Sequence, residues 1–176
     1  MQLITAILYD PSTLVTVSTA TLTAMTAFDT TNLRLTFTVP THGLVRAVIR
    51  VPSVGASALA YTLLGVLEGA TIIGRGLPAT RLANNAAIPS HNVLDIIIPN
   101  LTPGPAVWDA AYAVEDEVAS TAFKYGGPDT AIINDAYGAF SFEVWDPAPN
   151  PTNFSEIAID ASGNFIAKSS RPTGRP

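Results

Sequence analysis

The chain has 176 residues, of which 48% are apolar and only 13% are charged, with a formal net charge of −5. This length corresponds to one domain, and the apolar content excludes intrinsic disorder for most of the chain. Lys and Arg form no cluster, which excludes nucleic acid and anionic membrane as partners, and no apolar run approaches the roughly 20 residues of a membrane span. There is no Cys, so disulfides and thiolate metal sites are excluded.

The composition predicts an all-β protein. Thr, Ile and Val are abundant, and 12 Gly and 14 Pro are spread along the whole chain. β-branched side chains pack well on a pleated sheet, whereas regularly spaced Pro and Gly break helices and supply turns. No window of the sequence gives an amphipathic helix of three clean turns.

The first 26 residues differ from the rest of the chain. Gln2–Leu8 and Thr13–Val17 are predicted as short strands around Asp10-Pro11, and Thr19–Thr26 is a tract of Ala and Thr with little apolar bulk. We interpret residues 1–26 as an N-terminal arm or as added strands that pair with a sheet edge or a neighbour. The alternative is that they are ordinary first strands of a sheet.

Further along the chain, apolar and polar side chains alternate with the period of a half-buried strand. This pattern covers the segments Leu33–Val39, Val45–Val51, Trp108–Val114 and Phe140–Val144. Trp145 falls on the opposite face from Phe142, so we expect it at an interface or an edge. Ile157 to Lys168, with Asp160-Ala161-Ser162-Gly163 in the middle, predicts a small C-terminal hairpin.

Two segments break the alternation. Tyr61–Leu67 is apolar on both faces, and Ile96–Ile98 is a continuous apolar run. Such strands must be covered on both sides, either by a loop or by another subunit, and the low charge content favours another subunit. The candidate interface residues are Tyr61, Leu63, Leu67, Ile97 and Trp145.

Three segments together resemble the complement-type and tumour-necrosis-factor-like jelly rolls. Leu33–Val51, with Pro40-Thr41-His42-Gly43 at its turn, resembles a strand–turn–strand unit of that family. Ala27-Phe28 resembles its first short strand, and Gly138–Trp145 resembles its closing strand. The resemblance implies an antiparallel jelly-roll sandwich over residues 27–147, preceded by the arm and followed by the hairpin and an exposed tail in 148–176.

The middle of the chain also resembles small virion proteins of tailed bacteriophages. The similar pieces are Leu64–Thr71, Trp108–Glu115, Tyr125-Gly-Gly-Pro-Asp129 and Tyr137–Phe142. This resemblance implies a non-enzymatic structural protein of the virion, a homotrimer in contact with other virion proteins of the capsid or tail. We expect a capsid decoration or head-fibre protein. The alternative is a tail fibre or tail-tip component that binds a receptor or glycan.

The chain differs from the complement-type and tumour-necrosis-factor-like proteins, because it has no Cys and no collagen-like stalk. Residues 1–10 also lack the basic and apolar regions of a signal peptide, so we expect none. These features argue against a secreted, cytokine-like ligand.

The residues offer little for catalysis or metal binding. His42 and His91 are the only histidines, and both fall in predicted loops. The acidic run Glu115-Asp116-Glu117, joined by Asp129 and Asp135, is the one candidate cation site; its alternative is a solvated strand end. A glycosidase or another small hydrolase or lyase on a jelly-roll scaffold is a further alternative. We expect no catalytic residue, no metal site and no cofactor.

Overall fold

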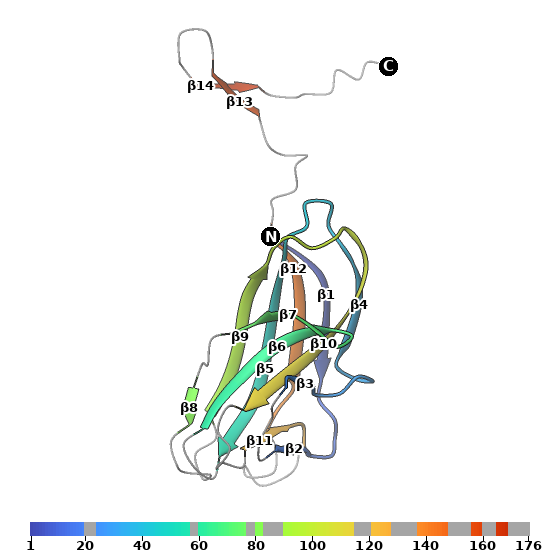
Figure 1. The fold of residues 1–176 in the computed structure, drawn as a ribbon, viewed down its shortest axis with the longest axis vertical. Coiled ribbons are helices and arrows are strands. Elements are labelled where there is room, and N and C mark those ends of the chain that lie inside the picture. Colours follow the sequence, from blue (N-terminus) through green and yellow to red (C-terminus); the bar gives the residue numbers. More distant parts are fainter. Residues whose placement is uncertain are drawn as a thin grey trace.

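The structure is a computed structural model that describes residues 1–19, 24–56, 60–76, 80–82, 90–114, 121–127, 137–147, 156–159 and 165–168. These residues form fourteen strands, which confirms the predicted all-β class. Within the same ranges, no helix is long and apolar enough to cross a membrane. Two antiparallel sheets face each other as a sandwich (Figure 1).

The first sheet, here called sheet A, is organised around its longest strand, β5. One side of β5 pairs with β9, and the other side pairs first with β12 and then with β11. β1 extends the sheet beyond β12, and β2 extends it beyond β11. The strands of sheet A are β1 (Gln2–Tyr9), β2 (Val15–Thr19), β5 (Val45–Ala56), β9 (Ser90–Ile98), β11 (Thr121–Tyr125) and β12 (Phe140–Asp146).

The second sheet, sheet B, is organised around β10. One side of β10 pairs with β6, which in turn pairs with β7 and β8, and the other side pairs with β4 and the short β3. Its strands are β3 (Thr26–Ala27), β4 (Arg34–Val39), β6 (Ala60–Glu68), β7 (Thr71–Arg75), β8 (Thr80–Leu82) and β10 (Gly104–Val114).

The predicted C-terminal hairpin is present as β13 (Glu156–Ile159) paired with β14 (Phe165–Lys168).

The order of the main strands follows a regular scheme. Without the short β2, β3, β8 and β11, sheet A runs β1-β12-β5-β9 and sheet B runs β4-β10-β6-β7. The first main strand of the chain therefore lies beside the last, and every neighbouring pair is antiparallel. This order is consistent with the jelly roll that the resemblance implies, because jelly rolls have eight main strands in two sheets.

The core lies between the sheets and follows the predicted alternation. β4 buries Leu35, Phe37 and Val39 and exposes the residues between them. β12 places Phe140, Phe142 and Val144 in the same core. Aromatic rings gather at one end, where Phe28 packs on Tyr112, Phe123 and Phe140 with centroid distances of 4.5 to 5.2 Å.

The N-terminal residues take part in both layers of the sandwich. Ile7 of β1 lies opposite Phe142 in register, so β1 is a strand of sheet A that packs on the core. The chain then bends at Pro11, whose carbonyl accepts a 2.9 Å hydrogen bond from Gly127 N–H, and continues as β2. Further on, Met25 lies over Gly65 on the outer face of sheet B.

Candidate interaction surface

Among the described residues, the outer face of sheet A brings together two ion pairs and several exposed apolar side chains. Because β5 buries Ala47 and Ile49 in the core, its intervening residues Arg46, Val48 and Arg50 point away from it. The strand register then places three rows of cross-strand neighbours on this face. The rows are Leu3–Trp145–Arg46–Ile97, Ala6–Glu143–Val48–Asp95 and Leu8–Ser141–Arg50–Val93.

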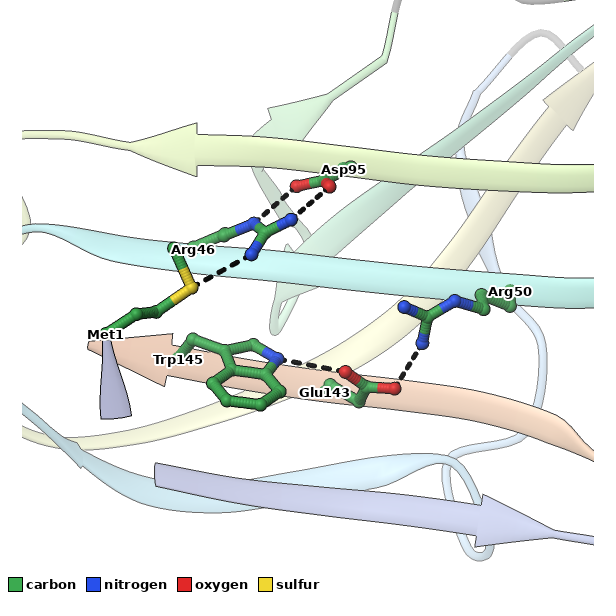
Figure 2. Close-up of polar contacts among 6 residues, drawn as sticks. All are labelled: Met1, Arg46, Arg50, Asp95, Glu143 and Trp145. Atoms are coloured by element: carbon green, nitrogen blue, oxygen red, sulfur yellow. Dashed lines mark hydrogen bonds and ion pairs between the residues drawn. The ribbon is translucent and has the colours of Figure 1, made fainter. Parts of the chain in front are cut away.

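Two ion pairs cross these rows (Figure 2). Arg46 donates from Nε to Asp95 Oδ1 at 2.6 Å and makes a second bond to the other oxygen of that carboxylate. Arg50 donates to Glu143, which also accepts a 2.9 Å hydrogen bond from Trp145 Nε1. Each arginine is thus paired with one carboxylate, and the four charges sum to zero.

The pairing of Arg46 with Asp95 changes the titration of both groups. The hydrogen bond from Arg46 holds the pKa of Asp95 below its ordinary value, and the same bond raises the pKa of Arg46. The stability that this pair contributes is therefore present above the ordinary pKa of an aspartate and is lost as the pH falls through the lowered value. Asp95 therefore stays charged and paired with Arg46 throughout the neutral range.

Apolar side chains surround the ion pairs. The described part of the chain has seven exposed large hydrophobic residues, and four of them, Leu3, Leu8, Val93 and Ile97, lie in the three rows. A fifth, Met1, brings its Sδ to within 2.9 Å of Arg46 Nη1. Val48, in the centre, is only 1% exposed. A neutral face with a concentration of exposed apolar groups is typical of a surface that binds another protein.

The same face is hollowed at one end. A cavity of about 400 Å³ lies where Leu8, Arg50 and Val93 approach Tyr137. Its rim includes His91, which is exposed. The cavity therefore continues the apolar surface and provides a depression into which a side chain of a partner can fit.

Two of the five candidate interface residues come together on this face. Arg46 pairs with Ile97 on one side and with Trp145 on the other, so both residues are cross-strand neighbours of Arg46. Ile97 is 59% exposed, whereas Ile96 packs against the core and Ile98 is buried in it. The apolar run of β9 is thus covered on its inner face only.

The other three candidate residues lie on β6 of sheet B. Leu63 and Leu67 are 3% and 6% exposed within the single chain, so neither offers surface to a partner. Met25 lies over Gly65, between them, which shows that part of the cover is the chain's own N-terminal segment. The backbone of Tyr61 pairs with Arg81, and its side chain lies outside the described residues.

Sequence reasoning missed Met1, Leu3, Leu8 and Val93. A signal was available for β1, because Gln2–Tyr9 is apolar on both faces, as Tyr61–Leu67 is. Val93 is followed directly by the apolar Leu94, so the sequence does not say which of the two faces outward; their faces depend on the register between β9 and β5. That register is a long-range property that the local sequence does not contain.

The residues weighed for chemistry do not form one site in the described ranges. His42 accepts a hydrogen bond at Nδ1 from Leu44 N–H, and its Nε2 lies 3.0 Å from Asp146 Oδ1. His91 lies on β9. Those ranges contain no group of three His, Asp or Glu side chains that could hold a metal. The acidic run Glu115–Glu117, Asp129 and Asp135 lies outside the described residues, as does the predicted exposed tail, Ser169–Pro176.

Comparisons with protein-family models and with curated proteins find no match to this chain.

Proposed function

We propose that this chain is a non-enzymatic structural protein of a bacteriophage virion that assembles as a homotrimer through the outer face of sheet A. The proposed assembly rests on one observation. Exposed apolar side chains surround two ion pairs on that face, and each ion pair has no net charge. Burying this surface in an oligomer removes apolar area from water without leaving an unpaired charge. The number of subunits and the phage context come from the resemblance of the sequence.

The strand order supports the same proposal. A sandwich ordered β1-β12-β5-β9 over β4-β10-β6-β7 is consistent with the jelly-roll scaffold that the resemblance implies. In this scaffold sheet A presents one broad outer face, while Met25 lies over part of the outer face of sheet B. Sheet A is therefore the better candidate for contact between copies.

Within the virion, we propose capsid decoration or a head fibre. The role would be mechanical, with the trimer bound to a neighbouring capsid protein. Antibodies raised against the purified chain test this role when they are applied to intact phage particles under the electron microscope. Label on the capsid is the expected result. Label on the tail would overturn the capsid assignment, and particles that lack the chain by mass spectrometry would overturn the virion assignment.

A further inference from the structure

A second feature, away from the outer face of sheet A, has the character of a ligand site. A cavity of about 470 Å³ opens at the end of the sandwich where β4 ends and β10 begins. Its volume falls within the roughly 300–1,000 Å³ of small-molecule sites. Core residues, Trp108 among them, reach it from between the sheets, and its walls come from the β9–β10 connection and from Glu68 at the end of β6.

The wall of this cavity is held in place by the turn between β4 and β5, and that turn lies at the upper end of the sandwich in Figure 1. Leu101 donates its N–H to the carbonyl of Gly43 at 3.0 Å, and Gly43, at φ +68°, approaches so closely that a Cβ would lie 2.6 Å from Leu101 O. Asn100 adopts the left-handed conformation, with φ 60°, which turns the chain around the opening. A site fixed in this way costs little ordering when a ligand binds.

The chemistry of the lining selects among ligand classes. Among the described residues, Glu68 is the one charged residue that lines the cavity, and no described Lys, Arg or His does, so this lining disfavours phosphates and carboxylates. Glu68 accepts hydrogen bonds, whereas Asn100 and Thr102 both donate and accept them. Pro103 and Pro105 add apolar ring surfaces. This combination suits a ligand that has hydroxyl groups on its rim and C–H groups on its face.

The floor of the cavity adds an independent observation. Trp108 is fully buried and packs edge to face on Phe37 at 4.7 Å. Its Nε1 is the one buried side-chain nitrogen or oxygen without a hydrogen-bond partner in the described part of the chain. Leaving a buried donor unpaired costs about 1–3 kcal/mol. Because this nitrogen has almost no exposed surface, a ligand oxygen could bond to it only if the lining of the cavity moved.

We propose that this cavity binds a neutral sugar ring, with its hydroxyl groups bonded to Glu68, Asn100 and Thr102. An organic ammonium ion is the competing ligand, because Glu68 is negatively charged. It would use only that carboxylate and would leave the amide, the hydroxyl and the two proline rings without a role. This inference depends on the cavity alone and does not depend on the homotrimer or on the virion.

The two tryptophans of the chain allow a residue-specific test. The indole N–H signals of Trp108 and Trp145 can be followed by NMR in the full chain, and Trp145→Phe identifies which is which. We expect at least one methyl glycoside from a panel of neutral hexoses to shift the Trp108 signal saturably while the Trp145 signal stays in place. No saturable shift with any glycoside would overturn the proposal, as would a shift produced by methylammonium and by no glycoside.

Two exposed lining residues supply the variants. Glu68→Gln and Thr102→Val should each weaken glycoside binding by about tenfold, the effect of one lost hydrogen bond. Asp10→Asn and Thr36→Val make the same kinds of change at exposed positions that do not line the cavity, and should leave the affinity unchanged. Equal affinities in all four variants would show that the glycoside binds elsewhere and would overturn the assignment.

Discussion

Ile97 and Trp145 lie on either side of Arg46, because β5 pairs with β9 through one edge and with β12 through the other. The guanidinium of Arg46 is bonded to Asp95. A partner that covers these two apolar side chains therefore also covers a charge that is neutralised within the same chain. That arrangement reduces the desolvation cost that an unpaired arginine would impose on an interface.

The first prediction concerns this arrangement. Ile97→Asp places an unpaired charge where the proposed trimer buries an apolar group, and should weaken association by more than about a hundredfold. Val107→Asp is the matched control, since Val107 is also β-branched and exposed but lies on β10 of sheet B. Analytical ultracentrifugation measures both. An intact trimer in Ile97→Asp, or equal dissociation in the two variants, would contradict the proposed interface.

The second prediction concerns the ion pair on the outer face of sheet B. Arg34 donates from Nε and Nη2 to the two oxygens of Asp109 at 2.8 Å, and the Asp109 side chain is only 4% exposed. Arg34→Met leaves a buried carboxylate without its partner and should lower the urea midpoint clearly. Adding Asp109→Asn should recover part of the loss. A double variant less stable than Arg34→Met would refute this account of the pair.

The third prediction concerns alkaline pH. Burial raises the pKa of Tyr125 to about 12, from 10.0 for an exposed tyrosine. The native state therefore holds the Tyr125 proton more tightly than the unfolded state does. The stability linked to this proton is complete below pH 10 and is lost as the pH rises towards 12. We expect a loss of about 2 kcal/mol in the free energy of unfolding over this interval. Tyr125→Phe cannot ionise at this position, so its free energy of unfolding should fall less than that of the unaltered chain over the same pH interval. Urea titrations that show equal losses in the two proteins would contradict the assignment.

The fourth prediction separates backbone strain from steric overlap. Gly126 and Gly138, whose backbones bond to each other, have φ values of +73° and +84°. A Cβ on Gly138 meets nothing within 4 Å, whereas one on Gly126 would lie 2.5 Å from the carbonyl oxygen of Pro11. Gly138→Ala should cost about 1 kcal/mol, for the left-handed backbone alone. Gly126→Ala should cost more, because it also pushes Pro11 away, and thermal melts that rank the two in reverse order would disprove this.

The alternation of side chains predicted most of the inner face of the sandwich. Phe142 and Val144 are buried, and Trp145 points away from them, as expected. Alternation assigns a face, however, and not the cover over that face. Ala111 and Ala113 alternate with the core residues of β10, so they lie on its other face, yet they are 0% and 9% exposed.

Contacts between distant segments set the limit of what the sequence could predict. β6 is apolar on both faces, which indicated a second cover, but the pattern could not say that Met25, 40 residues before Gly65, would supply part of it. In the same way, Leu8 and Val93 join the candidate surface only because β1 and β9 lie on opposite sides of the β12–β5 pair. Such neighbours follow from strand order, which the local sequence does not specify.

The solution mass of the chain, measured by light scattering over a dilution series, tests the central proposal most directly. A mass of about three times 18.4 kDa that persists on dilution is the result that a homotrimer through sheet A predicts. A mass of one chain at every concentration would contradict it, because the exposed apolar face of sheet A would then be stable in water without a second copy.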